Sequence, residues 1–445
     1  MKSDLPKGLH QVAGVPMVQL VCEAVTDAGV SNPIVVVGYQ GEKVRGALGP
    51  AFGFAVQEEQ LGTGHAALMA AQLLANHDGP VLVTPGDTPL LSAETLRSLI
   101  DNYIKNKAQV AMATFVTVEP KGYGRIVRGA DGTVAGIVEE KDATAEQKQI
   151  LEVNPAVYVF DCKLLFEILP GLKNSNAQGE YYLTDAIAEI CNRGGKVVAT
   201  VFDDPDEFMG VNDRWQLAEA SRIMRLRILK RHAMNGVTIV DPTSTYIDFD
   251  TEIETDVTIQ PMTVIEGGSR IGSGTTIGPN AWIKKSDIGH DCQVFMSHMD
   301  QAVMEDGSRC GPFSNLRPGT RLGNKVKVGN FVEIKNSDIG DQTAVSHLTY
   351  IGDATVGART NIGAGTITCN YDGFQKHRTE IGDDTFVGSN STLIAPRKIG
   401  DGAMVAAGSV VNQDVPDGAL AVGRARQENK EGWVVSWRNK QSNRH

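Results

Sequence analysis

One carboxylate of this chain lies where α/β proteins usually carry out chemistry. Asp87 comes shortly after residues 81–83, an apolar β-branched run that predicts a buried strand. Ligands of open α/β sheets bind beyond the carboxyl ends of the strands, where the loops leave the sheet. Asp87 could therefore hold a divalent cation, although the same residue in the same place could merely cap the next helix.

A second group of reactive side chains lies in the back half of the chain. His347 carries an imidazole, which titrates near neutral pH and can act as a general base. Arg317, Lys335 and Lys376 could bind phosphate, arginine through a bidentate fork and lysine as a point charge. Considered singly, the histidine is more simply a structural side chain and the cations are solvated surface charge. The sequence motifs around these residues must decide between a functional and a structural role.

The elements that would position these residues follow a six-residue apolar period. Helices repeat at about 3.6 residues and strands at about 2, so this period predicts a parallel β-helix. Recurrent pairs such as Ile271-Gly272, Ile277-Gly278 and Ile339-Gly340 predict tight corners with positive φ. Residues 368–379 interrupt the period, and such an insertion usually carries function. The periodic residues are Ile247, Ile253, Ile259, Ile265, Ile271, Ile277 and Ile283, then Leu316, Leu322, Val328 and Ile334, then Ile381, Val387, Leu393, Ile399 and Val405.

The front half predicts an α/β domain. Its apolar runs alternate with helical stretches, which favours a largely parallel sheet covered by helices. Strands are expected at residues 34–37, 81–83, 110–116 and 156–160, and helices at residues 16–28, 64–75 and 93–105. From Asp213 to about Met234 the pattern is helical, capped by Asn212 or Asp213 and ended by Asn235-Gly236.

These patterns divide the chain into four parts. Residues 1–212 form the α/β domain, 213–236 a linker helix, 237–424 the solenoid and 425–445 a basic tail. The tail, which includes Arg438 and Arg444, could pack on a neighbouring subunit or stay mobile.

Composition and charge limit the classes of function. The 445 residues are 41% hydrophobic and 21% charged, and the net charge of −11 argues against general nucleic-acid or membrane binding. The six cysteines form no C-x-x-C pair, which predicts reduced thiols rather than disulfides or a zinc site. No run reaches the ~18 apolar residues of a transmembrane helix, and the N-terminus lacks the apolar core of a secretory signal. The cytoplasm is the expected compartment.

The order of α/β domain, long helix and hexapeptide solenoid resembles one enzyme family. This is the family of the bifunctional N-acetylglucosamine-1-phosphate uridylyltransferase/glucosamine-1-phosphate N-acetyltransferase, which makes UDP-N-acetylglucosamine for bacterial cell-wall polymers. The resemblance covers essentially the whole chain. Its segments are Lys2-Ser-Asp-Leu-Pro-Lys7, Glu59-Gln-Leu-Gly-Thr-Gly-His65, Gly86-Asp87, Gly122-Tyr-Gly-Arg125, Gln178-Gly-Glu-Tyr-Tyr182, Gly210-Val-Asn212, Leu316-Arg-Pro-Gly319, Gly329-Asn-Phe-Val-Glu-Ile-Lys335, His347-Leu-Thr-Tyr350, Asn361-Ile-Gly-Ala-Gly-Thr366 and Cys369-Asn-Tyr-Asp-Gly373.

The resemblance implies a Rossmann-like nucleotidyltransferase domain, a long helix, and a left-handed parallel β-helix that forms homotrimers with acetyltransferase sites between subunits. It implies that His347 is the catalytic base of acetyl transfer. Ala364 and Ala407 could equally be plain packing residues. The other matches are Arg317, Lys335, Tyr350, Asn361 and Lys376 for glucosamine 1-phosphate, and Ala364, Asn370, Tyr371, Ser389, Ala407 and Arg424 for acetyl-CoA.

The resemblance also implies a uridylyltransferase site in the front domain. Transfer from UTP to N-acetylglucosamine 1-phosphate releases pyrophosphate and requires Mg²⁺. Asp87 and Asn212 match the magnesium ligands. Each of the remaining residues could by itself be an ordinary loop residue. They are Lys7 for phosphate, Gln57, Gly62 and Thr63 for uracil, and Gly124, Glu139 and Asn154 for the N-acetylglucosamine.

The N-terminus departs from the family pattern. Relatives begin with a buried central strand and a glycine-rich loop that cradles the triphosphate, and Met1 corresponds to a position just after them. We expect that Met1 is an internal methionine of a longer protein. The alternative is an acetyltransferase-only protein whose truncated front domain is disabled. In addition, Pro155-Ala156 replaces Thr-Gly, and Gly8 replaces a bulkier aliphatic residue.

Two other classes of protein compete with a bifunctional transferase as readings of this sequence. A zinc hydratase on a left-handed solenoid, like the γ-type carbonic anhydrases, needs three converging histidines. The solenoid histidines His290, His298, His347 and His377 lack a paired spacing, which disfavours that class. A non-catalytic trimerisation scaffold is the other class, and it would acetylate nothing. The sequence therefore predicts an enzyme with two activities.

Overall fold

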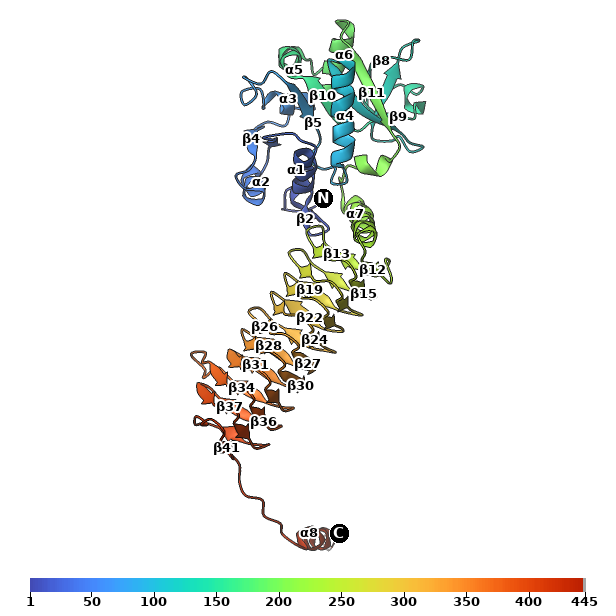
Figure 1. The fold of residues 1–445 in the computed structure, drawn as a ribbon. Coiled ribbons are helices and arrows are strands. Elements are labelled where there is room, and N and C mark those ends of the chain that lie inside the picture. The colour runs from blue at the N-terminus through green and yellow to red at the C-terminus, as the bar shows by residue number, and fades with distance from the viewer. Residues whose placement is uncertain (443–445) are drawn as a thin grey trace. The chain divides into compact units, whose positions relative to one another are not determined.

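The computed structural model describes residues 1–442 and divides into two compact units (Figure 1). The first unit is Met1–Arg227 and the second begins at Ile228. Helix α7 (Arg214–Met234) crosses this boundary. The end of the tail that carries Arg444 lies outside the described residues.

The first unit is built on a mixed seven-stranded sheet. The strand order is β5-β10-β6-β9-β7-β8, and β11 pairs with β6. The helices are α1 (Met17–Asp27), α2 (Gly41–Leu48), α3 (Thr63–Leu68), α4 (Ala93–Asn106), α5 (Cys162–Ile168) and α6 (Leu183–Asn192), with 3-10 turns η1 (Lys7–Leu9), η2 (Gln147–Gln149), η3 (Leu169–Gly171) and η4 (Pro205–Phe208). The strands are β1 (Gln11–Val12), β2 (Val15–Pro16), β3 (Ile34–Val37), β4 (Gly53–Val56), β5 (Pro80–Val83), β6 (Val110–Val116), β7 (Gly124–Arg128), β8 (Val134–Val138), β9 (Glu152–Asn154), β10 (Tyr158–Asp161) and β11 (Val197–Phe202).

The expectation of a largely parallel sheet is wrong. In the seven-stranded sheet the one parallel pairing within residues 1–442 is that of β11 with β6, whereas β10 pairs antiparallel with both β5 and β6. The reason lies in the path of the chain: β7 and β8 form an antiparallel pair, after which β9 and β10 return along β6. Strand β9 pairs with Phe115 and Val116 and β10 with residues 110–112, both antiparallel, so the two form one strand interrupted at residues 155–157.

Strand β6 forms the centre of two hydrophobic cores, one on each face of the sheet. Val110 and Met112 pack with α5 and α6, while Ala111, Ala113 and Phe115 pack with α1 and α4. Alternate side chains of a strand point to opposite faces, so a strand covered on both sides is apolar at every position. Strands β3 and β4 form a separate parallel pair, and no pairing joins them to β5 within residues 1–442.

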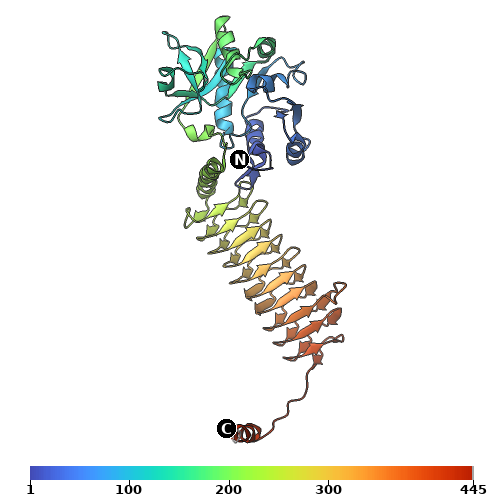
Figure 2. The same ribbon diagram turned by 180° about the vertical axis from the view of Figure 1, so that it is seen from behind.

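The second unit is a left-handed parallel β-helix whose coils stack in three sheets (Figure 2). We call these the first, second and third solenoid sheets. The first contains β12 (Thr238–Ile239), β15 (Thr258–Ile259), β18 (Thr276–Ile277), β21 (Gln293–Val294), β24 (Arg309–Cys310), β27 (Lys327–Asn330), β30 (Ala344–His347), β33 (Asn361–Ile362), β36 (Phe386–Val387), β39 (Met404–Val405) and β41 (Leu420–Ala421). The second contains β13 (Tyr246–Ile247), β16 (Val264–Ile265), β19 (Trp282–Lys284), β22 (His298–Asp300), β25 (Asn315–Leu316), β28 (Glu333–Lys335), β31 (Tyr350–Gly352), β34 (Ile367–Cys369), β37 (Thr392–Ile394) and β40 (Val410–Val411). The third contains β14 (Glu252–Ile253), β17 (Arg270–Ile271), β20 (Asp287–Ile288), β23 (Val303–Met304), β26 (Arg321–Leu322), β29 (Asp338–Ile339), β32 (Ala354–Val356), β35 (Thr379–Ile381) and β38 (Arg397–Ile399).

The periodic isoleucines form the inner columns of this solenoid. Ile247 pairs with Ile265, and Ile265 pairs with Ile283, all on the second sheet. These three side chains are at most 2% exposed. Every third member of the six-residue series therefore falls on the same sheet, which confirms the predicted stacking.

The expected reason for the corner glycines is mostly wrong. Gly278 has a positive φ of 91°, but Gly272 and Gly340 do not lie in that region. They are instead pressed against the next coil, because a Cβ on Gly272 would lie 2.7 Å from the carbonyl carbon of Gly289. A Cβ on Gly340 would likewise lie 2.6 Å from the amide nitrogen of Ala358. Close stacking of coils, rather than backbone twist, requires glycine there.

Helix α7 begins and ends as the sequence predicts. The Asp213 carboxylate accepts a hydrogen bond from the Gln216 amide at 2.8 Å, and the Gln216 side chain accepts one from the Asn212 amide at 2.7 Å. The two bonds follow the pattern of a capping box, except that the Gln216 side chain reaches the residue before the cap. Gly236 follows the helix with φ of 92°. In the tail, α8 (Trp433–Ser442) is exposed throughout. Among residues 1–442, none of the helices combines the length and the apolar character needed to cross a bilayer.

Candidate functional site

Three sequence-predicted residues of the front domain converge on one point. Lys7, at the start of η1, forms an ion pair with Asp87, and its ammonium lies 2.5 Å from Oδ1 of Asn212. The Val211 amide also donates to the carbonyl of Asp87 at 2.9 Å. The loop after β5 and the segment before α7 are thereby held together. A carboxylate oxygen and an amide oxygen thus face the same cation.

This arrangement fits a magnesium ion. The Lys7 ammonium stands where Asp87 and Asn212 direct their oxygens, and Mg²⁺ prefers such oxygen ligands. Mg²⁺ usually takes only one or two protein carboxylates and completes its shell with water and phosphate. No group of three His, Cys, Asp or Glu side chains that could enclose a metal occurs within residues 1–442.

The predicted uracil-reading residues lie around the start of α3. Gln57 follows β4, and its amide nitrogen donates to the Gly62 carbonyl at 3.2 Å. The hydroxyl of Thr63 accepts the Leu183 amide at 3.0 Å. Gly62 has φ of 112°, and a Cβ there would lie 2.6 Å from the Tyr181 carbonyl oxygen. Glycine is therefore required at position 62 for both backbone conformation and space.

Gly124, Glu139 and Asn154 meet at the ends of β7, β8 and β9. Gly124 and Asn154 are register partners, and a Cβ on Gly124 would lie 3.6 Å from both Asn154 Cβ and Glu139 Oε2. Burial raises the pKa of Glu139, opposed by a hydrogen bond from the Thr184 hydroxyl at 3.0 Å. The surface they share combines hydrogen-bonding groups with a glycine that leaves room, as a sugar site requires.

The two small departures from the family pattern have clear local effects. Ala156 adopts φ of 63°, a region that glycine enters without strain and alanine does not. Its amide donates to Asn154 Oδ1 at 3.1 Å, while Asn154 Nδ2 donates to the Tyr158 hydroxyl at 2.7 Å. Asn154 is consequently fixed from both ends. At Gly8, a Cβ would lie 3.2 Å from Cβ of Val18, so the space is already filled by α1.

The predicted phosphate-binding cations gather at one corner of the solenoid. Arg317 and Lys335 each end a second-sheet strand at equivalent positions, since Leu316 pairs with Ile334. Lys376, from the insertion, lies close enough to lower the pKa of Lys335, to which Arg317 also contributes. The lowered pKa of Lys335 shows that positive charge gathers at this corner, which is the environment that an anion would neutralise.

His347 belongs to a different corner, at the end of the first-sheet strand β30. Asn330, His347, Ala364, Ser389 and Ala407 each stand two residues after a buried strand residue of this sheet. Those buried residues pair in one column in the order Val328, Val345, Ile362, Val387 and Val405. The structure therefore aligns the predicted base with three predicted acetyl-CoA residues. Asn330 is the one member that the sequence did not single out.

The remaining predicted residues surround these two corners. Tyr350 begins β31 and pairs with Glu333, whereas Asn361 begins β33 on the first sheet. The cations and Asn361 are thus not brought together by one chain. A Cβ on Gly408, next to Ala407, would lie 3.8 Å from Cδ of Arg424, so Arg424 lies beside the acetyl-CoA column.

The insertion is a small hairpin that leaves the register of the solenoid intact. Tyr371 and Lys376 form an antiparallel bridge, and Ile362 still pairs with Val387 across the interruption. Asn370 is 8% exposed, while Tyr371 is 60% and Phe374 92% exposed. The base of the hairpin is anchored and its tip projects from the chain.

Two acidic side chains beside the predicted cations carry no signal in the sequence. Glu333 pairs with Arg317 at 2.7 Å, and Asp353 accepts hydrogen bonds from Asn336 and Asn370. Burial opposes ionisation of Asp353, but these hydrogen bonds and the neighbouring lysines prevail and lower its pKa. Their positions relative to the cations depend on coil register, so no local sequence signal identifies them.

Arg125 belongs to the segment Gly122-Tyr-Gly-Arg125, and the sequence pattern assigns it no role. Its side chain is 2% exposed and pairs with the part-exposed Glu140 at 2.7 Å, directly after Glu139. An ion pair to a buried arginine thus holds the strand end that carries Glu139.

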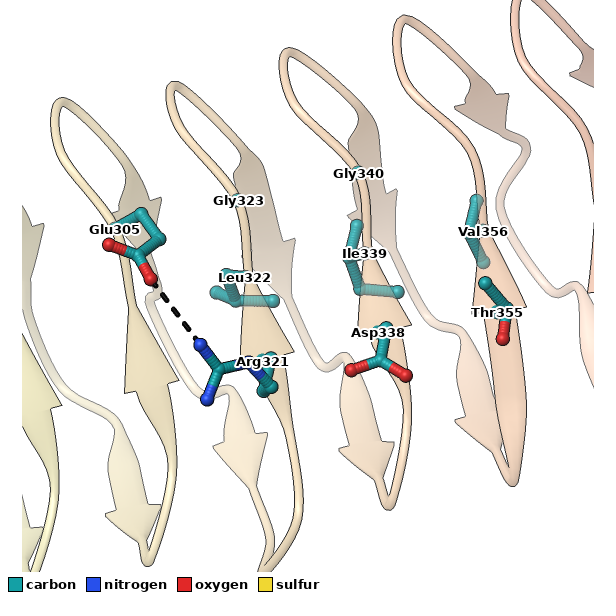
Figure 3. Close-up of a pocket in the computed structure, with 9 residues that line it drawn as sticks. All are labelled: Glu305, Arg321, Leu322, Gly323, Asp338, Ile339, Gly340, Thr355 and Val356. Carbon is teal, nitrogen blue, oxygen red and sulfur yellow. Dashed lines mark ion pairs between the residues drawn. The ribbon is translucent and has the colours of Figure 1, made fainter.

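The groove in Figure 3 is not part of either site. It lies over β26, β29 and β32 of the third solenoid sheet and contains the ion pair of Arg321 with Glu305 at 3.6 Å. None of its lining residues is a predicted site residue.

Comparison with known proteins agrees with this division. Residues 2–216 match the nucleotidyl transferase family, and residues 250–285 and 378–413 match the bacterial transferase hexapeptide (six repeats) family. The chain is 51% identical to the bifunctional protein GlmU of Carboxydothermus hydrogenoformans, over 98% of this chain and 97% of that protein. It is 49% identical to the bifunctional protein GlmU of Geobacillus thermodenitrificans, covering 99% and 96%, and 47% identical to that of Streptococcus agalactiae, covering 98% and 95%.

Fold and matches together define a transferase in which a nucleotidyl transferase domain precedes a hexapeptide-repeat β-helix. Both halves align with the same relatives across nearly their entire length. The chain belongs to the bifunctional GlmU family.

Proposed function

We propose that this protein makes UDP-N-acetylglucosamine in two steps. It transfers an acetyl group from acetyl-CoA to glucosamine 1-phosphate, and then a uridylyl group from UTP to N-acetylglucosamine 1-phosphate. The observation that carries the proposal is the 47–51% identity to bifunctional relatives over both halves of the chain. It favours two activities over acetyl transfer alone. We assign uridylyl transfer to residues 1–212 and acetyl transfer to residues 237–424.

Acetyl transfer needs a base, an anion site and a groove for coenzyme A. We assign the base to His347, which takes the proton as the sugar amine attacks the thioester carbonyl. The C–N bond forms, the C–S bond breaks, and coenzyme A leaves as its thiolate. Arg317, Lys335 and Lys376 hold the phosphate, supported by the mutual proximity that lowers the pKa of Lys335. The small residues of the first-sheet column leave backbone accessible to acetyl-CoA.

Uridylyl transfer joins a sugar phosphate oxygen to the α-phosphorus of UTP and breaks the bond to the β-phosphate, so that pyrophosphate leaves. Lys7 offsets phosphate charge, Gln57, Gly62 and Thr63 orient the uracil, and Glu139 and Asn154 hold the sugar. Mg²⁺, bound by Asp87 and Asn212, would supply charge neutralisation for the phosphates.

We also propose that the chain works as a homotrimer. A column of corner residues that follow the first-sheet strands is mostly apolar, and its apolar members are 36–62% exposed. Phe313 and Phe331 stack there with ring centroids 5.3 Å apart. The apolar members are Met262, Met296, Phe313, Phe331 and Leu348, all with positive φ, and the polar Asn280 lies between the first two. Apolar side chains that project along one edge of a prism favour burial against other copies.

A trimer would also complete the acetyltransferase site. His347 and the three cations occupy opposite ends of the second-sheet strands of one chain, so residues of a neighbouring chain are needed to join them. We assign part of this contribution to the exposed tip of the insertion, with Tyr371 and Phe374.

We place the protein in the cytoplasm. UTP and acetyl-CoA are available there, and all six cysteines are unpaired thiols, as expected in a reducing compartment.

Separate assays of the two half-reactions test the proposal. Acetyl transfer is followed by release of free coenzyme A thiol, and uridylyl transfer by release of pyrophosphate in the presence of Mg²⁺. His347→Ala is expected to abolish the first and spare the second. Asp87→Ala is expected to do the reverse, so each variant controls the folding of the other. Persistence of acetylation in His347→Ala would refute the assignment of the base.

Light scattering tests the trimer. The unsubstituted chain is expected at three times the mass of one chain, and Phe331→Glu at a lower mass with acetyl transfer lost but uridylyl transfer retained. A monomeric unsubstituted chain that acetylates normally would contradict the trimer.

A further inference from the structure

One side chain contacts the ring of His347, and no role has been assigned to it. Asn330 ends β27 and is the register partner of His347 in β30. Its Oδ1 lies 2.6 Å from Nδ1 of the imidazole. It directly precedes His347 in the first-sheet column that continues through Ala364, Ser389 and Ala407.

The backbone fixes Asn330 more firmly than an exposed loop would. Its carbonyl accepts the Leu348 amide at 3.0 Å, which ties the two coils together on the far side of His347. At the preceding position, a Cβ on Gly329 would collide with the carbonyl of Ser346, so the two strands approach as closely as glycine permits. The backbone therefore fixes the position from which the side-chain amide of Asn330 contacts the imidazole of His347.

This contact decides which ring nitrogen is free. An amide oxygen can only accept, so Nδ1 must carry the proton when it faces Oδ1. In the neutral ring the lone pair is then on Nε2. The side chain of His347 is exposed and has no ion pair within residues 1–442, so no charged group competes with Asn330 for this role.

We propose that Asn330 is a positioning residue for acetyl transfer, because it holds His347 in the tautomer and orientation that present Nε2 to the sugar amine. The inference rests on the proposed role of His347 as the base. We assign Asn330 no bond to either substrate, and it acts through His347.

Two substitutions test the inference in the full-length chain. Asn330→Ala removes the acceptor, and kcat for acetyl transfer is expected to fall by about 10- to 100-fold, a part of the ~10²–10⁴-fold that a general base contributes. The KM values for acetyl-CoA and glucosamine 1-phosphate should stay within about twofold, since the substrates are bound elsewhere.

Asn330→Asp keeps an acceptor in the same place and adds a negative charge. An opposite charge favours the imidazolium, so the acidic limb of the pH profile of kcat/KM for acetyl transfer should move up by about one pH unit. Activity well above that limb should be largely retained. A merely structural role for Asn330 would lower activity at all pH values and would leave the limb in place.

Controls separate this inference from the proposed function and from folding. Uridylyl transfer and oligomeric mass should be unchanged in both variants. Gln342→Glu, at an exposed corner that follows the third-sheet strand β29, adds the same charge and should leave both kcat and the acidic limb unchanged. If His347→Ala abolishes acetylation while both Asn330 variants match the unsubstituted chain in kcat and pH profile, the inference is overturned and the proposed function stands. If His347→Ala still acetylates, the proposed base itself has failed.

Discussion

Protonation of His232 should destabilise the end of helix α7 in acid. His232 is 5% exposed, its Nε2 has no hydrogen-bond partner, and burial together with the adjacent Arg231 lowers its pKa to about 4. In the unfolded chain the same group titrates near 6.5. As the pH falls below 6.5 the unfolded state takes up the proton first, so stability is present above that pH and is lost towards pH 4. At ~1.4 kcal/mol per pH unit the loss amounts to about 2–3 kcal/mol.

The substitution His232→Leu removes this titration and keeps the site filled. Urea unfolding followed by circular dichroism, at pH values above 6.5 and near 4, gives the free energy of unfolding of both proteins. Because carboxylates also titrate in this range, the quantity of interest is the difference between the two proteins. We expect His232→Leu to gain about 2–3 kcal/mol over the unsubstituted chain between these pH values. The exposed His77, changed to Gln, controls for the loss of a histidine. A difference that stays constant with pH would refute the reasoning.

Three further outcomes follow from the geometry. In Gly62→Ala the alanine must adopt φ of 112°, and its Cβ would lie 2.6 Å from the Tyr181 carbonyl oxygen, at a cost of ~1–3 kcal/mol. KM for UTP should therefore rise about tenfold or more, while acetyl transfer is unchanged. Gly340→Ala forces two coils apart and should lower the free energy of unfolding in urea by ~1–3 kcal/mol. In Gly46→Ala, in helix α2, nothing lies within 4 Å of the added Cβ, so the free energy of unfolding in urea should rise by ~0.5–1 kcal/mol. Ile283→Ala empties part of a fully buried column and should cost ~2–5 kcal/mol in urea unfolding. Equal stability of Gly340→Ala and Gly46→Ala would contradict the close stacking of coils.

The sequence predicted elements whose pattern is local. The six-residue period alone places Ile247, Ile265 and Ile283 in one column, because each coil repeats the same order of inward residues. Strand β6 and helix α4 also fall where their apolar patterns place them. The direction of β10 was not predictable from its composition, since a buried apolar strand looks the same in parallel and antiparallel sheets. Its direction follows from the return of the chain along β6 after the β7–β8 pair, a long-range pairing that its own residues do not encode.

The residues of the candidate sites also divide into those with a local sequence pattern and those whose role depends on long-range contacts. Lys7, Asp87 and Asn212 were singled out by motif, and the fold brings them together. Asn330 and Asp353 were not, because their contacts are made to side chains one coil away. A role that depends on a neighbour 17 residues distant leaves no mark on the residues adjacent in sequence.

The column that contains His347 also limits how such a site can change. Equivalent positions in adjacent coils are one strand spacing apart, about 4.8 Å, so distances along this edge come only in multiples of that step. Adding or removing a whole coil would lengthen or shorten the groove and leave the local chemistry of each rung intact. A one-residue insertion within a strand would instead move every later side chain of that strand to the opposite face of the sheet, so that inward residues point outward. The looped-out hairpin between Ile362 and Val387 shows the tolerated route, in which extra residues leave the ladder and return in phase.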